Sequence, residues 1–185
     1  MSLTDSNHDL PIAPNRLREL AAPVRRDVVW VSDITYVTTT GGFLYVAGVL
    51  DRCTRRCIGW AMGDTLATTL PLAALDMALQ QRRPPAGLVH HSDRGVQYAS
   101  TACRQRLALA GVIPSMSRRG NCYDKAAMES FWSSLKRELV HRWKFVSHAE
   151  AKAAIFEWIE VFYNRERFHS ALGFTSPVDF ETNLN

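Results

Sequence analysis

Three acidic residues, Asp33, Asp93 and Glu129, have positions that suit metal-dependent chemistry. Asp33 lies in an apolar run between Val31 and Ile34, where β propensity and burial both disfavour an aspartate. Carboxylates that approach one another repel strongly, and a hard divalent cation is their natural neutraliser. Two such ions, about 3.5–4 Å apart, activate an oxygen nucleophile and stabilise a leaving oxygen at phosphorus. The three acids therefore suggest phosphoryl-transfer chemistry.

The elements that must position these acids can be predicted from the pattern of residues. Three runs rich in Val, Ile, Tyr and Trp follow one another, and Gly41-Gly42 is a hairpin signal between the first two. The opening of the fold is therefore predicted to be an antiparallel meander, and helical patterns then take over. The predicted order is strands at 28–39, 43–51 and 56–64, a helix from about 69 to 82, a strand at 87–90, a helix at 98–110, a strand at 112–114, a loop at 115–125, and helices at about 123–142 and from 148 onward. The last helix begins with the capping box Ser147-His148-Ala149-Glu150 and carries on one face Ile155, Trp158, Ile159 and Phe162.

The predicted elements bring the three acids toward one place. Asp93 follows the strand at 87–90, where open sheets with helices on both faces place their ligands. If that strand lies parallel to the first, Asp33 and Asp93 meet at one edge. Glu129 lies about a quarter-turn from the centre of an apolar helical stripe, and Lys136 returns to nearly the same direction. Taken singly, Glu129 also fits a solvated helical glutamate and Lys136 an ordinary surface lysine.

Composition narrows the classes of protein. The chain has 185 residues, 46% of them hydrophobic, a formal net charge of +4 and a pI near 9.0. This suits one domain and a polyanionic partner, although many basic domains bind no nucleic acid. No apolar run approaches the roughly 18 residues of a membrane span, and the four cysteines lack zinc-site spacing. We expect a soluble, intracellular protein with an arm or linker at 1–26 and a core at 27–185 that carries a C-terminal helical extension.

A family resemblance follows from the spacing and from the stretches around the acids. Thirty-five residues separate Asp93 from Glu129, the D,D(35)E spacing of retroviral integrases and many insertion-sequence transposases. The chain resembles the insertion-sequence transposases of the OrfB type, whose second reading frame carries an integrase-like core, over nearly everything from Asn15 onward. The matching stretches are WVSDITYV at 30–37, LDRCTRRCIGWAM at 50–62, HHSDRGVQYAS at 90–100, SMSRRGNCYDKAAMESFWSSLKREL at 115–139 and FYNRERFHSALGFTSPVDF at 162–180.

The resemblance implies a fold, a reaction and partners. It implies an α/β, ribonuclease H-like fold, with a five-stranded mixed sheet flanked by helices. Asp33, Asp93 and Glu129 would be the catalytic residues that hold two Mg²⁺ or Mn²⁺ ions. The implied function is DNA cleavage and strand transfer during transposition, by a homo-oligomer on element-end and target DNA. Members usually carry an upstream helix-turn-helix segment, and only the arm at 1–26 precedes this core, so we expect that segment to be missing or on a separate protein.

The chain departs from this group at two positions. Lys125 stands where the group usually has asparagine, and Phe168 where it usually has proline or another short or polar residue. Neither departure touches the three acids.

Other polar residues have both a functional and a structural interpretation. His90 and His91 point to opposite faces of a strand, which favours structural roles, and Asp51 is most simply a turn residue. Tyr98 either lines a DNA channel or packs in the core. The motif at 163–169 contacts DNA or serves fold and subunit packing. The candidate DNA contacts are Lys136, Arg118, Arg119, Asn121, Tyr98 and Arg137.

Two alternative functions keep the same site residues. The first is a ribonuclease H-like or structure-specific nuclease, which the 35-residue spacing disfavours. The second is a catalytically silent DNA-binding remnant of a transposase, which the presence of all three acids disfavours.

Overall fold

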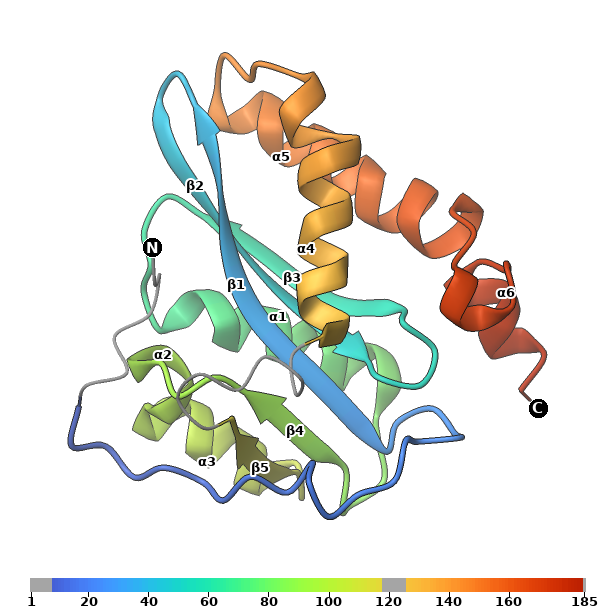
Figure 1. The fold of residues 1–185 in the computed structure, drawn as a ribbon. Helices are drawn as coiled ribbons and strands as arrows, with labels where there is room; N and C mark the ends of the chain where they lie inside the picture. The colour runs from blue at the N-terminus through green and yellow to red at the C-terminus, as the bar shows by residue number, and fades with distance from the viewer. Residues whose placement is uncertain (1–7, 118–125, 185) are drawn as a thin grey trace.

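A computed structural model describes residues 8–117 and 126–184, and its centre is one five-stranded sheet (Figure 1). The strand order across the sheet is β3-β2-β1-β4-β5. Neighbouring strands are antiparallel from β3 to β1 and parallel from β1 to β5, so the sheet is mixed and opens with the predicted meander. The strands are β1 (Val29–Thr39), β2 (Gly42–Asp51), β3 (Cys57–Gly63), β4 (Val89–Ser92) and β5 (Ile113–Met116).

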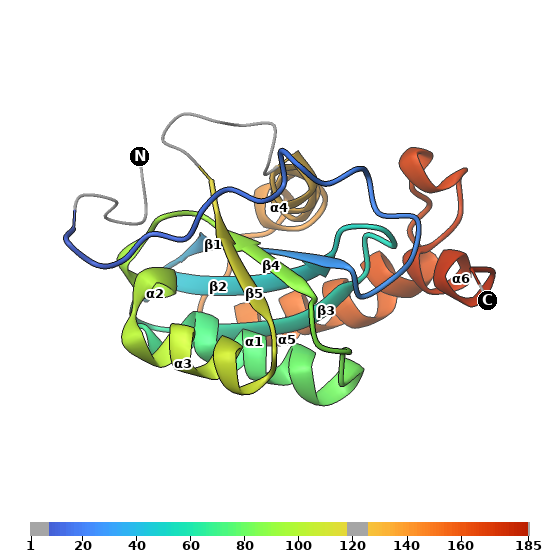
Figure 2. The same ribbon diagram turned by 90° about the horizontal axis from the view of Figure 1, so that it is seen from below.

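Helices cover both faces of the sheet, and Figure 2 shows α4 on one side and α1 and α3 on the other. One apolar cluster joins β1 and β2 to α4 and α5, and a second joins the opposite faces of the same strands to α1 and α3. This explains why β1 has apolar residues at both odd and even positions. The helices are α1 (Thr69–Arg82), α2 (Val96–Ala99), α3 (Thr101–Leu109), α4 (Ala126–Glu138), α5 (His148–Glu157) and α6 (Pro177–Thr182), with short turns η2 (Val140–Arg142) and η4 (Ser170–Leu172).

Two predicted strands end too early. The sequence placed them at 87–90 and 112–114, whereas β4 continues to Ser92 and β5 to Met116. Their last residues pair in parallel register, with His91 opposite Ser115. The prediction failed because serines and histidines at strand ends carry no apolar pattern, while the backbone pairing with a neighbouring strand is enough to extend them.

Two predicted helices also differ from the structure. The helix predicted at 98–110 is two helices, α2 and α3, separated at Ser100, whose backbone is extended and whose side chain caps α3 by accepting from the Cys103 N–H. Phe162, predicted on the buried face after α5, is 38% exposed. The reason is that α5 continues into a π-helical segment, η3 (Trp158–Glu166), whose wider turn brings Tyr163 and Asn164 inward instead.

The end of the chain packs on the edge of the sheet through polar contacts. The Asn164 side chain accepts from the Cys57 N–H at 2.9 Å and donates to the Cys57 carbonyl at 2.9 Å, so it pairs with edge strand β3 as another strand would. The Tyr163 hydroxyl donates to the Arg55 carbonyl. Tyr163 and Asn164, two residues of the motif at 163–169, therefore hold the C-terminal segment against the sheet. In the described part of the chain, no helix is long and apolar enough to cross a membrane.

Candidate active site

The register of β1 and β4 brings Asp33 and Asp93 level with each other. Val31 on β1 pairs with His91 on β4 in a parallel register. Asp33 and Asp93 each lie two residues beyond this pair, and adjacent strands are about 4.8 Å apart, so the two carboxylates leave the same end of the strand pair. The Asp93 carboxylate also accepts a hydrogen bond from the Gly95 N–H at 2.8 Å, which orients it in the turn before α2. The parallel pairing of β1 and β4, on which the expected approach of Asp33 and Asp93 depended, is present.

Close packing of α4 on the β1–β2 hairpin brings Glu129 to Asp33. Gly48 is the register partner of Asp33 on β2. A Cβ at Gly48 would lie 3.0 Å from Cη2 of Trp132, so the indole occupies the space that a side chain would need. The missing side chain therefore lets α4 approach the strands beside Asp33, with Met128 fully buried and Glu129 on the exposed border, as its helical position predicts.

Asp33 and Glu129 line one open groove, which we call the acidic groove. Its volume is about 610 Å³, and it lies between β1 and α4. Lys136 and Arg137 line it as well, so helical spacing correctly predicted that Lys136 shares the side of Glu129. His141 is a further lining residue that sequence reasoning missed; its four-residue spacing from Arg137 is the only signal that points to it.

Tyr98 is buried close to the two aspartates. Its side chain is 3% exposed, and its hydroxyl has no hydrogen-bond partner among the described residues. Burial raises the pKa of Tyr98 well above its ordinary value, and the negative charges of Asp33 and Asp93 raise it further. A buried side chain offers DNA no surface, so the predicted direct DNA contact is corrected to a place in the core beside the carboxylates.

The two histidines before Asp93 have structural partners, as the sequence favoured. A hydrogen bond of 2.7 Å joins His90 Nε2 to Ser32 Oγ, and one of 2.9 Å joins His91 Nδ1 to Ser115 Oγ. Burial, and to a smaller extent the neighbouring His91, lowers the pKa of His90 to about 3, so His90 is neutral at pH 7. Asp51 is fully buried and accepts hydrogen bonds from its own turn, which confirms the turn interpretation.

The carboxylate oxygens of Asp33, Asp93 and Glu129 are chemically suited to binding a hard divalent cation. Carboxylate oxygens are the ligands that Mg²⁺ prefers, often with only one or two carboxylates from the protein. Within residues 8–117 and 126–184, no three His, Cys, Asp or Glu side chains gather closely enough to form a complete metal site. The case for a metal site therefore rests on two pairs of acids. Asp33 and Asp93 lie level with each other on neighbouring strands, and Asp33 and Glu129 line the same groove.

Three of the predicted DNA contacts, Arg118, Arg119 and Asn121, lie outside the described residues. The two that are described on α4, Lys136 and Arg137, both line the acidic groove. The Lys136 ammonium lies 5.3 Å from the centroid of the Tyr36 ring. A cation held over an aromatic face has a fixed position, and Lys136 and Arg137 place positive charge on the α4 wall of the groove, the wall that also carries Glu129.

Comparison of the sequence with protein-family models shows which family the chain belongs to. The integrase core domain model matches residues 23–122, more than half of the chain, and this range includes Asp33 and Asp93. The chain belongs to the integrase core domain family. A second integrase core domain model matches residues 110–177 of this integrase core, which include Glu129.

Curated relatives come from bacterial insertion sequences. The integrase core is 50% identical over 177 residues to the insertion element IS600 uncharacterized 31 kDa protein of Shigella sonnei, which covers 96% of this chain and 65% of the relative. It is 40% identical to the transposase for insertion sequence element IS904 of Lactococcus lactis, over 91% of this chain and 66% of the relative. It is 41% identical to the transposase InsF for insertion sequence IS3A of Escherichia coli, over 94% and 60%. The chain thus spans somewhat less than two thirds of these relatives.

Solved structures support the fold. The integrase core superimposes with a TM-score of 0.70 and 12% identity on a chain of the simian T-cell lymphotropic virus intasome in complex with the PP2A regulatory subunit B56 gamma, covering 96% of this chain and 60% of that one. It superimposes with a TM-score of 0.63 and 10% identity on the HTLV-2 integrase catalytic core domain in complex with magnesium, covering 85% and 98%. The predicted ribonuclease H-like fold is confirmed.

Proposed function

We propose that this integrase core is the catalytic part of a DNA transposase that cleaves DNA at an element end and transfers the strand to a target. The observation that carries the proposal is the level placement of Asp33 and Asp93 on parallel strands, with Glu129 across the groove from Asp33. The similarity to the IS904 and IS3A transposases supports DNA as the substrate. The chain would then act on the nucleoid in a bacterial cytoplasm.

In this proposal the acids hold metal and the bases hold DNA. Asp33, Asp93 and Glu129 would bind two Mg²⁺ or Mn²⁺ ions, which supply activation of the attacking oxygen and stabilisation of the leaving one. Lys136 and Arg137 would bind phosphates beside the scissile bond, because cationic side chains on the wall of the groove orient the backbone without reading bases. Arg118, Arg119 and Asn121 would act in the same way from the preceding segment.

The rest of the proposal concerns partners and organisation. Residues 1–26 would be an arm on the core at 27–185; Leu17 packs into the core and the Arg16 N–H donates to Ser115 Oγ. A homo-oligomer on DNA would pair two element ends, and a helix-turn-helix segment, on this protein or another, would choose the DNA. The simian T-cell lymphotropic virus intasome supports assembly on DNA by analogy of fold.

The test is strand transfer with labelled terminal DNA from the flanking repeats of the source genome, with and without Mg²⁺. Asp33→Asn, Asp93→Asn and Glu129→Gln should each lower cleavage and joining at least about 1,000-fold, since each removes a metal-binding charge from a step that requires it. DNA binding, followed by fluorescence anisotropy, should stay within about twofold. Full activity in any of the three variants would disprove the assignment, and preferential cutting of an RNA–DNA hybrid would favour a ribonuclease H.

A further inference from the structure

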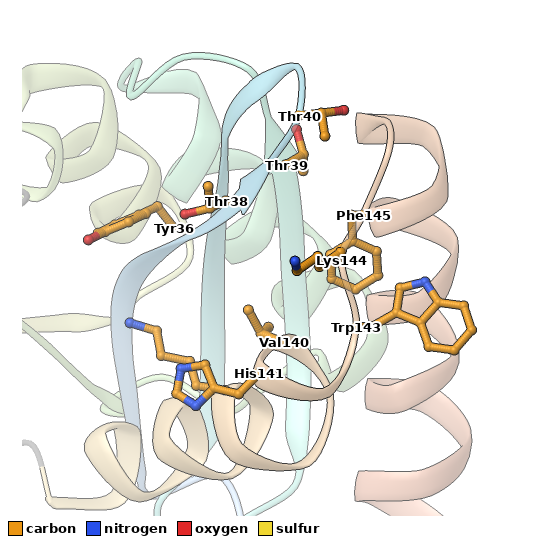
Figure 3. Close-up of a pocket in the computed structure, with 10 residues that line it drawn as sticks. Tyr36, Thr38, Thr39, Thr40, Val140, His141, Trp143, Lys144 and Phe145 are labelled. Atoms are coloured by element: carbon orange, nitrogen blue, oxygen red, sulfur yellow. The ribbon is translucent and has the colours of Figure 1, made fainter.

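A second groove continues the acidic groove along β1, and we call it the lateral groove. Its volume is about 470 Å³, and it lies between the last residues of β1 and the segment after α4. Lys136 and His141 line both grooves, so the two are continuous. Figure 3 shows the lateral groove with Tyr36 at one margin and Trp143 at the other. From Asp33 to Thr39 the strand rises roughly 20 Å, which matches about six nucleotides of a B-form strand.

The segment after α4 is tied to β1, so the walls of the lateral groove are fixed relative to each other. The Thr40 N–H donates to the Phe145 carbonyl at 3.1 Å, and Thr39 forms a parallel bridge with Phe145. Phe145 itself is 1% exposed and anchors the segment in the core. A groove with anchored walls requires little ordering when a ligand binds, which favours binding.

Trp143 is an exposed aromatic side chain in a fixed position. It is 60% exposed, yet its Nε1–H donates to Glu150 Oε1 at 2.9 Å. The other Glu150 oxygen accepts from the Val146 N–H at 2.7 Å, and Ser147 caps α5 by accepting from the Glu150 N–H. The capping box of α5 therefore positions the indole in solvent. An exposed indole held in this way is suited to stacking on a planar ligand.

The charges of the lateral groove select an anion. Lys136 and Lys144 line it, and no acidic side chain is among its described lining residues. Contact with the Tyr36 ring, 5.3 Å from the ammonium, holds Lys136 at the junction of the two grooves. Two cations and an aromatic platform in a row, beginning beside the acids, match the alternating phosphates and bases of a nucleic-acid strand.

We propose that the lateral groove binds an unpaired DNA strand that continues from the acidic groove, with phosphates at Lys136 and Lys144 and a base stacked on Trp143. Bases inside a duplex already stack on both neighbours, so an unpaired base offers the indole a face that an internal base pair does not. The inference rests on the proposed DNA substrate and adds to it a preference for DNA whose end is frayed next to the scissile phosphate.

The first test compares two DNA probes, a 30-base-pair duplex and the same duplex with six unpaired nucleotides at one end. Trp143→Ala should weaken binding of the frayed probe about tenfold, a typical effect of losing one base-stacking contact, and leave the duplex within about twofold. Trp143→Phe should restore most of the affinity. Phe168→Ala, which removes another exposed aromatic ring, is the matched control and should have no effect.

The second test concerns the charges. Lys144→Ala should reduce the slope of log Kd against log salt by about one, because one phosphate contact is lost. The control is Lys152→Ala, which removes a half-buried lysine that donates to Asp64 away from the groove, and it should keep the wild-type slope. An equal change in both variants would mean a diffuse basic surface and would overturn the proposal.

A third measurement needs no variant that alters folding. Trp143 is 60% exposed, Trp60 is half-buried and Trp30, Trp132 and Trp158 are buried, so the acrylamide quenching that wild-type protein shows and Trp143→Phe lacks reports on Trp143. Saturating frayed DNA should protect Trp143 from the quencher, and the duplex should not.

Unchanged quenching would overturn the lateral-groove proposal while metal-dependent cleavage still supports the proposed function. If wild-type protein binds neither probe, both proposals fail together. If Trp143→Ala changes self-association instead of DNA affinity, the groove is a contact between copies.

Discussion

Two groups of acidic side chains lie in this fold and are neutralised in different ways. In the arginine cluster, Glu181 on α6 is 5% exposed and accepts hydrogen bonds from Arg26, Arg56 and Arg82, the last through two bonds of 2.5 and 2.6 Å. In the acidic groove, Glu129 is exposed beside Asp33. A carboxylate removed from water needs permanent partners from the chain, whereas one at an open groove keeps its oxygens accessible to an external cation. Charge alone therefore does not separate structural from functional acids.

The largest expected effect comes from breaking the arginine cluster. Glu181→Ala leaves three guanidinium groups without their shared carboxylate, and we expect the free energy of unfolding to fall by about 3–5 kcal/mol. Urea denaturation measures this change. Glu129→Ala, its counterpart in the acidic groove, should change stability by no more than about 0.5 kcal/mol because the side chain is exposed. Equal losses in the two variants would remove the distinction between the groups.

A smaller effect is expected from crowding the floor of the acidic groove. Gly48→Ala places a Cβ 3.0 Å from the Trp132 ring, so the indole must give by a few tenths of an ångström and presses α4 away from the strands. We expect a loss of about 1–3 kcal/mol in stability, and a greater loss in strand transfer than stability explains, since Glu129 moves away from Asp33. Thermal unfolding and single-turnover assays at a temperature where the variant is fully folded separate the two. Unimpaired strand transfer would show that close packing at Gly48 is not needed.

The pH dependence of the free energy of unfolding reports on two buried groups, His90 near the acidic groove and Glu181 in the arginine cluster. His90 has a folded pKa near 3 because it is buried, against 6.5 in the unfolded chain. The unfolded state thus binds the extra proton, and stability should fall by about 1.4 kcal/mol per pH unit from His90 alone as pH drops below 6.5. Glu181, whose pKa its arginine partners lower, adds a loss only below its ordinary value near 4.5. Urea titrations from pH 7 to 4 should show a shallower slope in His90→Asn; an unchanged slope would contradict this account.

Metal binding should produce the smallest change in stability, and only in the acidic groove. At a Mg²⁺ concentration about ten times its Kd, the folded state gains about 1.4 kcal/mol, which raises Tm by roughly 3–6 °C for a chain of this size. Asp33→Asn should remove this shift, and excess EDTA should reverse it in the wild type. Asp179→Asn, which changes an acid on α6, is the control and should respond to Mg²⁺ as the wild type does. A shift that persists in Asp33→Asn would place the ion elsewhere.

Local patterns were sufficient for most of the fold. The meander, α1 and the capped start of α5 were predicted because apolar periodicity, Gly41-Gly42 and the Ser147 capping box act over a few residues. Local sequence patterns gave wrong element ends or a wrong buried face where contact with a segment distant in the sequence determines the structure. β5 includes Ser115 because β4 lies beside it, and Phe162 turns outward because η3 packs Asn164 against the backbone of Cys57.

For the candidate site, the sequence by itself determined the three acids, their spacing and the helical side that Glu129 shares with Lys136. Only the tertiary structure decided that Asp33 and Asp93 lie level, because that depends on parallel pairing of strands far apart in the chain. It also moved Tyr98 from the DNA surface to the core and added Trp143 and Lys144 to the surroundings of the site. The physical reason is that burial and groove lining arise from the packing of whole elements, which no single stretch of sequence records.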